Sequence, residues 1–184
     1  MHLNHLLIAA AVGLFLSAPV LASVAENVER LKKTTQCPSC DLRGADLSGL
    51  RLMSANLSGA DLRDANLRKT ILYRADLSRA DLRGARLSNA SLGRIILNYA
   101  DMRDLELDGA RLGHAELRGA DLSGSTLRKG MLQQADLREA VLAGTDLTGT
   151  SLKHAKIEGS TLTGAILDEA DLRFVDLRNV TDMV

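Results

Sequence analysis

A leucine occupies every fifth residue from Leu42 to Leu177, and this spacing constrains the fold more than any other feature of the chain. The series has 28 positions without a slip, and only Met102 and Ile157 replace leucine. An α-helix cannot hold these residues on one face, because five residues at about 100° each turn successive leucines about 140° apart. A straight strand fails as well, because its side chains alternate with a period of two. Each unit must therefore contain a turn that brings the next leucine back to the same side.

The residues around each leucine indicate where that turn lies. The residue two before the leucine is alanine in 17 of the 28 units, and the residue two after it is glycine in 11 units. Small side chains fit the inside of a tight bend, and glycine tolerates unusual backbone dihedrals there. The pattern predicts a solenoid whose interior is a column of leucines flanked by alanines.

A longer period sets the number of units in one coil. Aspartate directly precedes the leucine at 20-residue intervals from Asp41 to Asp121, and arginine directly follows it at the same intervals from Arg43 to Arg103. This indicates four units and four faces per coil, and hence about seven coils. At a strand spacing of about 4.8 Å the rod would be roughly 30–35 Å long.

The unbroken tandem word A-D-L resembles that of the pentapeptide-repeat family over residues 40–179. Close matches are Ala60-Asp61-Leu62, Ala75-Asp76-Leu77 and Ala120-Asp121-Leu122. The resemblance implies an all-β fold, a right-handed quadrilateral β-helix with four pentapeptides per coil. It implies no common enzymatic activity. Exported members often share a signal peptide, a short helical segment and a C-P-x-C-D-L entry with this chain.

Residues 1–22 read as a secretory signal peptide. The stretch through Leu21 has no Lys, Arg, Asp or Glu and contains an apolar run at residues 6–16, and cleavage after Ala22 or after Ala25 fits the small-residue pattern. An uncleaved anchor is the alternative, although the run is shorter than the about 20 residues that span a bilayer. We expect export to the periplasm or secretion, or to the periplasm or thylakoid lumen in a cyanobacterium.

Residues 23–39 are expected to form an N-terminal helix and cap. Ser23 and Glu26 have the spacing of a capping box, and Val24, Val28 and Leu31 form one apolar stripe on a helix over residues 24–34. A helix of this length is marginal alone in water, so we expect its stripe to dock on the open first rung of the repeats.

Cys37 and Cys40 form a C-x-x-C pair with three interpretations. A thioredoxin-like redox motif needs a βαβ context, which is missing. A zinc site needs four ligands, and the other soft ligands of the mature chain, His114 and His154, are far along the sequence. The third interpretation is a structural disulfide in an exported protein that pins the cap.

Two sets of outward residues break the polar pattern of the rod. Met53, Ile71 and Tyr73 are expected on one face of adjacent coils, where the N-terminal helix covers them, or a partner protein binds them, or they are scatter. The C-terminal tail, residues 180–184, leaves the last coil without a clear cap. We therefore expect a homodimer edge that includes Phe174, Val175 and Val180.

The charges exclude several classes of function. The chain has 23 Lys+Arg and 23 Asp+Glu, so it lacks the net basic excess of a nucleic-acid-binding protein. A convex rod with a filled interior offers no cleft that perturbs the pKa of a carboxylate, and we expect no catalytic residue, metal or cofactor. After signal cleavage no membrane contact is expected.

Two function classes remain. The first is an exported, non-enzymatic structural or protein-interaction module with an unknown protein partner. The second is a DNA-mimic inhibitor or protector of a topoisomerase such as gyrase, a role of some proteins in the family. Those mimics are acidic and cytoplasmic, so a neutral chain with a signal peptide favours the first class.

Overall fold

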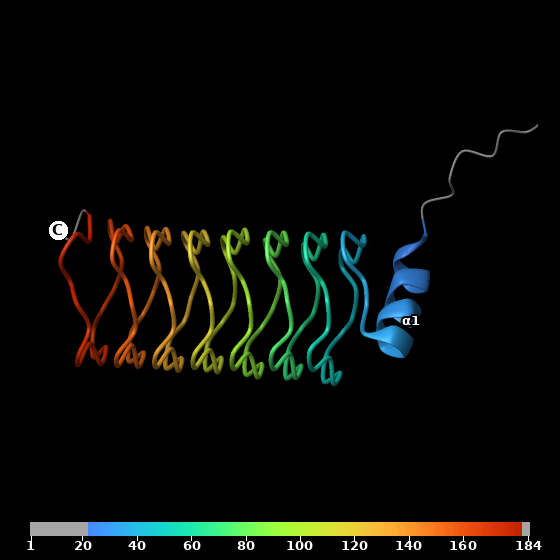
Figure 1. Ribbon diagram of the computed structural model, residues 1–184, viewed down its shortest axis with the longest axis horizontal. Coiled ribbons are helices and arrows are strands. Elements are labelled where there is room, and N and C mark those ends of the chain that lie inside the picture. Colours follow the sequence, from blue (N-terminus) through green and yellow to red (C-terminus); the bar gives the residue numbers. More distant parts are fainter. Residues whose placement is uncertain (1–21, 182–184) are drawn as a thin grey trace, which may run out of the picture.

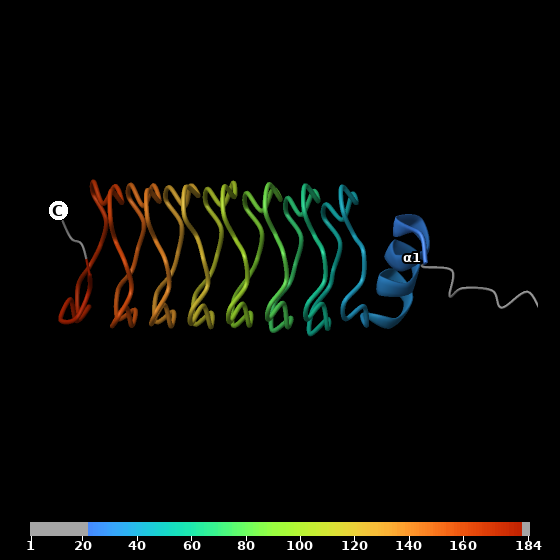
Figure 2. The same cartoon turned by 90° about the horizontal axis from the view of Figure 1, so that it is seen from above.

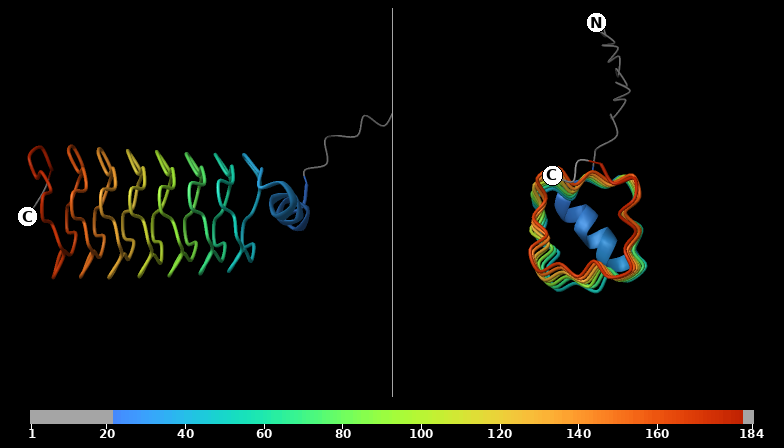
Figure 3. Two further views of the ribbon diagram at one scale, coloured as in Figure 1. Left: turned by 60° about the horizontal axis from the view of Figure 1, so that its bottom comes forward. Right: turned by 90° about the vertical axis from the view of Figure 1, so that its left-hand side faces the viewer.

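The structure is a long rod with one helix at its N-terminal end (Figures 1 and 2). It is a computed structural model that describes residues 22–181. The predicted signal peptide, apart from Ala22, and the last residues of the predicted tail lie outside the described residues. Seen along its axis, the rod has a nearly square outline in which successive coils superpose (Figure 3).

The coils are joined by single parallel β-bridges between residues 20 apart in sequence. The series begins with Gln36↔Asn56, continues through pairs such as Asp61↔Asp81, and ends with Thr161↔Thr181. At a bridged residue the backbone is hydrogen-bonded to the preceding and to the following coil. Asp61 N donates to Cys40 O of the preceding coil at 2.9 Å, and Leu62 N donates to Asp81 O of the following coil at 2.7 Å. The β-helix and its 20-residue register, both predicted from the spacing of leucines and aspartates, are confirmed. No strand longer than one bridge occurs in the described part of the chain.

A turn follows every leucine. Leu62 O accepts a hydrogen bond from Ala65 N at 3.0 Å, and the residue two after the leucine has a positive φ, 63° at Gly44 and 59° at Asp64. Glycine adopts this left-handed conformation freely, whereas another residue costs roughly 1–2 kcal/mol. The predicted bend is therefore present, and it tolerates many residues besides glycine.

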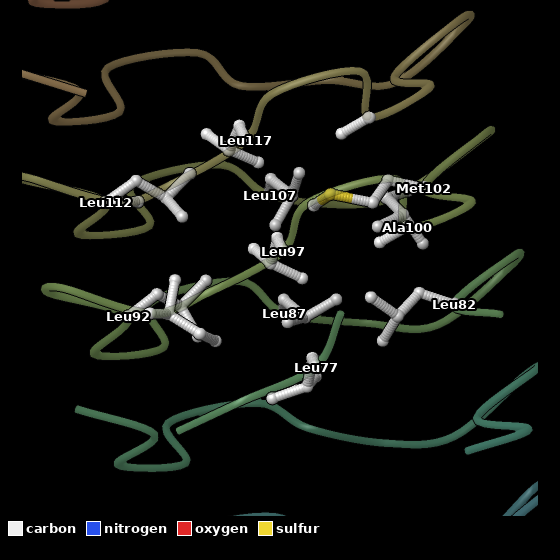
Figure 4. Close-up of a cluster of buried hydrophobic side chains, with 14 of the residues drawn as sticks. Leu77, Leu82, Leu87, Leu92, Leu97, Ala100, Met102, Leu107, Leu112 and Leu117 are labelled. Atoms are coloured by element: carbon white, nitrogen blue, oxygen red, sulfur yellow. The ribbon is translucent and has the colours of Figure 1, made fainter. Parts of the chain in front are cut away.

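The core is the predicted column of aliphatic side chains (Figure 4). Leu77, Leu97 and Met102 are fully buried, and so is Ala60 at an inner corner. Four corner residues donate a hydroxyl hydrogen bond to a backbone carbonyl of the preceding coil, as Thr145 Oγ1 does to Leu122 O at 2.9 Å; the others are Thr70, Ser125 and Thr150. These polar residues enter the core with their hydrogen bonds satisfied, whereas the buried hydroxyl of Ser160, near the C-terminal end, has no partner.

The helix α1 (Val24–Thr34) closes the N-terminal end. Its capping box is formed: Glu26 N donates to Ser23 Oγ at 3.2 Å and Ser23 N donates to the Glu26 carboxylate at 2.8 Å. Leu31 is fully buried, while Val24 and Val28 pack against the core. The helix crosses the open end of the first coil (Figure 3), so the predicted docking is confirmed. Among residues 22–181 no helix is long and apolar enough to cross a membrane.

The last coil is more loosely built than the others. Leu167 and Leu172 are only partly buried, and Leu177 is 38% exposed. Gly159 N donates to Asn179 O at 3.0 Å, whereas Gly119 N, at the equivalent position two coils earlier, donates to Arg138 O. The hydrogen-bond register therefore slips by one residue at this corner of the final coil, whereas the bridge between Thr161 and Thr181 keeps the 20-residue register.

Candidate interaction surfaces

The outer surface has four faces, which we number by their central buried residues. The first face surrounds Leu42, the second Leu47, the third Leu52 and the fourth Leu57, each with the equivalent positions every 20 residues further on. Within a face, the residue before each central leucine and the two residues after it point outward and stack into columns along the rod.

The predicted partner patch lies on the third face. Ile71 pairs with Arg51 in a β-bridge, and Tyr73 O accepts from Ser54 N at 2.9 Å, so the patch spans two adjacent coils. Met53 is 45% exposed, and Ile71 and Tyr73 are half-buried. Because α1 lies across the end of the rod and leaves Met53 exposed, the helix does not cover the patch. Binding of a partner here stays a prediction.

The Tyr73 ring packs against the next coil in a way that was not predicted from the sequence. A Cβ at Gly93, in the next coil, would lie only 3.2 Å from Tyr73 Cδ2, so the ring occupies the space that this glycine leaves. The Arg74 guanidinium lies 5.5 Å from the ring centroid. The aromatic ring is therefore supported from two sides while part of its surface faces solvent.

The predicted dimer edge is exposed at the C-terminal end. Phe174 is 71% exposed, and Val175 and Val180 are half-buried against the core. The Phe174 ring stacks on His154 with centroids 4.5 Å apart and an interplanar angle of 6°. Lys153 Nζ lies 5.6 Å from the same ring. The edge thus offers apolar surface, and dimerisation through it stays a prediction.

Cys37 and Cys40 form a disulfide, with the two sulfurs 2.08 Å apart. Both are buried beneath α1, at 0% and 3% exposure. Arg30 of the helix donates to Cys37 Sγ at 3.3 Å and also to Cys40 Sγ, and Asn27 donates to Asp41 O at 2.9 Å. The structural interpretation of the pair agrees with this arrangement, because the disulfide and the helix hold the first corner together.

The aspartates and arginines of the first face form a continuous ladder. Arg63 lies 2.6 Å from Asp61 in its own coil and 3.6 Å from Asp81 in the next, and the pattern repeats along the face. The hydrogen bond from Arg43 lowers the pKa of Asp41 to about 2. The hydrogen bonds from the neighbouring arginines likewise lower the pKa of Asp61 and of Asp81. These carboxylates are held ionised, which suits a solvated structural face and not acid–base catalysis.

No group of three or more His, Cys, Asp or Glu in the described residues could hold a metal ion. A shallow hollow of about 520 Å³ lies on the second face. It is lined by Ser48, Gly49, Asn66, Arg68, Lys69, Ser88 and Asn89. This lining contains no carboxylate, thiol or imidazole, so it has no acid–base pair.

One feature of the third face was missed by the sequence prediction. From Arg51 to His154 its outward positions include no Asp or Glu, while Arg74, Arg94 and Arg111 are exposed there. The net charge of the whole chain is zero and therefore does not show that this face lacks acidic residues. Writing the sequence in rows of 20 residues and adding charges down each column would have found it.

Comparison with known proteins places the repeats in one family. A family model described as pentapeptide repeats matches with 8 copies, over residues 39–73, 75–113, 106–144, 132–164 and 145–181. Among curated proteins, none matches the chain.

Three solved structures are examples of similar chains. QnrB1, a plasmid-mediated fluoroquinolone resistance protein, is 19% identical, with 71% of this chain and 76% of that chain covered and a TM-score of 0.44. HetL, which is involved in heterocyst differentiation regulation in the cyanobacterium Nostoc, is 27% identical, with coverage of 88% and 97% and a TM-score of 0.26. Rfr23 from the cyanobacterium Cyanothece is 24% identical, with coverage of 87% and 99% and a TM-score of 0.36. These superpositions are too loose to support a function.

Proposed function

The chain belongs to the pentapeptide-repeat family, and on this premise we propose that it is a non-enzymatic protein-interaction rod that binds its partner through the third face. Proteins of this family are generally structural or interaction proteins. The interior of this rod is filled with leucine and alanine, so any ligand must be bound on the outside. The carboxylates of Asp61 and Asp81 on the first face are paired with arginines.

The observation that carries the proposal is the patch of Met53, Ile71 and Tyr73. Isolated apolar side chains are ordinary on a protein surface, but three on adjacent coils form one contiguous area. Its central ring is fixed by Gly93 and Arg74 before any partner arrives. A rigid, partly exposed aromatic side chain is a typical anchor of a protein–protein interface, because little side-chain entropy is lost on binding.

Site-specific crosslinking tests this proposal. The photo-crosslinking amino acid p-benzoylphenylalanine is placed at Tyr73, and in a matched control at Tyr99. Tyr99 suits as the control because it is also a tyrosine whose ring lies over a glycine, but it lies off the third face and is 56% exposed. In the organism that makes the protein, position 73 should give one discrete adduct that position 99 does not. Equal adducts at both positions, or none at position 73, would contradict the proposal.

Export and assembly belong to the same proposal. We propose that the protein acts in the periplasm or an equivalent exported space, after loss of residues 1–22, and that its right-handed rod has about seven coils.

We also propose that two copies associate through the last coil, since Phe174, Val175 and Val180 are accessible there. Light scattering should give a dimeric mass for the mature chain and a monomeric mass for Val175→Arg. A monomeric mass for the unmodified protein at high concentration contradicts the dimer.

A topoisomerase-directed role is disfavoured by the charges. A DNA mimic needs a row of free carboxylates, whereas Asp61, Asp81 and Asp101 on the first face each contact arginine. A gyrase supercoiling assay separates the two functions. Potent inhibition by the mature protein would overturn the interaction-rod proposal in favour of the mimic.

A further inference from the structure

Positive charge is concentrated on the third face, although the chain as a whole is neutral. This face carries Arg51, Arg74, Arg94, Arg111, Lys153 and Arg173, and its one carboxylate is Asp171 in the last coil. The 23 acidic residues that balance the 23 basic ones therefore lie mostly on the other three faces and outside the repeats. The third face therefore has an excess of positive charge, and a partner that approaches it meets a local positive potential although the net charge of the chain is zero.

Three arginines of this face, unlike Arg173, which pairs with Asp171, are not engaged with a carboxylate. Among the described residues, Arg74, Arg94 and Arg111 contact no carboxylate, and Arg74 is engaged only with the Tyr73 ring. Arginines of the first face differ, because Arg63 is 2.6 Å and 3.6 Å from two aspartates. An arginine without a carboxylate keeps its full fork of donors for an incoming anionic group.

Exposed apolar side chains share the face with these arginines. Met53 and Met131 are 45% and 41% exposed, and Tyr73 lies between them along the face. Arginine, methionine and tyrosine are enriched in protein–protein interfaces, while lysine, aspartate and glutamate are depleted there. The third face combines these three enriched residue types, with serine, glycine, glutamine and histidine among its other outward positions.

We infer that the third face is the docking surface for an acidic protein surface, one in which Asp and Glu side chains surround an apolar contact. The inference rests on the proposed interaction function and names the chemistry of its partner. Apolar contact centred on Tyr73 would supply the anchor, and Arg74, Arg94 and Arg111 would pair with carboxylates around it. A protein suits the face better than a polynucleotide, because a single-stranded polynucleotide is bound by several stacked aromatic rings along a groove. Between Arg51 and His154, Tyr73 is the one Phe, Tyr or Trp on this face.

The test measures binding of defined anionic probes to the full mature chain. The probes are a labelled copolymer of glutamate and tyrosine, a labelled single-stranded oligonucleotide, and vesicles of phosphatidylcholine with and without phosphatidylglycerol. Fluorescence anisotropy or co-sedimentation gives Kd at low salt and at 0.15 M salt. The acidic copolymer should bind more tightly than the other probes, and more weakly as salt rises.

Two variants with the same change in net charge locate the binding. The test variant replaces Arg74, Arg94 and Arg111 with glutamine, and the control replaces Arg43, Arg63 and Arg83 of the first face with glutamine. Copolymer binding should weaken at least tenfold in the test variant and no more than about twofold in the control. Circular dichroism checks that both remain folded. Equal weakening in the two variants, or no binding by the unmodified chain, overturns the inference. Preferential binding of the oligonucleotide or the anionic vesicles also overturns it and assigns the face to that class.

Crosslinking through position 73 separates failure of this inference from failure of the proposed function. If the Arg74, Arg94 and Arg111 variant still gives the discrete adduct at unchanged yield, a partner binds but its acidity is not what the face recognises. If no adduct forms with the unmodified arginines, the interaction function itself fails.

Discussion

Truncation of one central leucine tests the inward column that defines the fold. Leu122 is fully buried, and its backbone is held to the following coil by two bonds: its N donates to Val141 O at 2.8 Å, and its O accepts from Thr145 Oγ1 at 2.9 Å. Leu122→Ala removes three carbons, worth about 2.4 kcal/mol of transfer free energy. Because these bonds limit how far the neighbouring coils can close in, a residual cavity should raise the loss of unfolding free energy to about 3–5 kcal/mol.

Leu177→Ala is the matched control. Leu177 has the same place in its unit but is 38% exposed, in the coil whose hydrogen-bond register slips. Less apolar area is lost there and the opening is shared with solvent, so the cost should be about 1–1.5 kcal/mol. Urea unfolding at pH 7, followed by far-UV circular dichroism, gives both values, and an unchanged m-value shows that the same transition is measured. A loss for Leu122→Ala no larger than that for Leu177→Ala would refute the inward assignment.

Three further predictions concern the ladder, the cap and the polar corners. Since the folded pKa of Asp41 is about 2, below its unfolded value of roughly 3.9, the ladder should contribute stability fully above about pH 4 and lose it as pH falls toward 2; urea midpoints across this range check the sign. Replacing Cys37 and Cys40 with alanine should cost about 2 kcal/mol by loop entropy and speed amide hydrogen exchange in α1 more than in the central coils, and uniform acceleration would contradict a local role. Thr145→Val should cost about 1 kcal/mol through the lost hydrogen bond to Leu122 O, measured by thermal denaturation, and a more stable variant would contradict that role.

The N-terminal helix shows how far local sequence could be trusted. Its capping box and apolar stripe predicted the helix over residues 24–34 and its docking on the first coil, and both are confirmed. These signals involve residues within one or two turns of each other, so the sequence alone contains them. The bonds from Arg30 to the two cysteine sulfurs could not be predicted, because they depend on the angle at which the helix crosses the coil.

The corners show the limit of the glycine signal. Glycine two residues after the leucine predicted a bend with unusual backbone dihedrals, but Asp64 and Tyr99 adopt the same left-handed φ as glycine there, near 60°. The following coil decides how such side chains lie: the Tyr99 ring occupies the space over Gly119, as Tyr73 does over Gly93. The sequence of one pentapeptide does not predict this ring packing, because the tyrosine and the glycine it covers are 20 residues apart.

The sequence by itself determined the repeat, the inward column and the 20-residue register. It could do so because each coil of a solenoid contacts only its neighbours, so spacing along the chain translates directly into position along the rod. The tertiary structure decided what the outside presents: paired charges on the first face, free arginines around Tyr73 on the third, and an open last coil. Those properties depend on which side chains of different coils reach one another, and on the missing neighbour at the end of the stack.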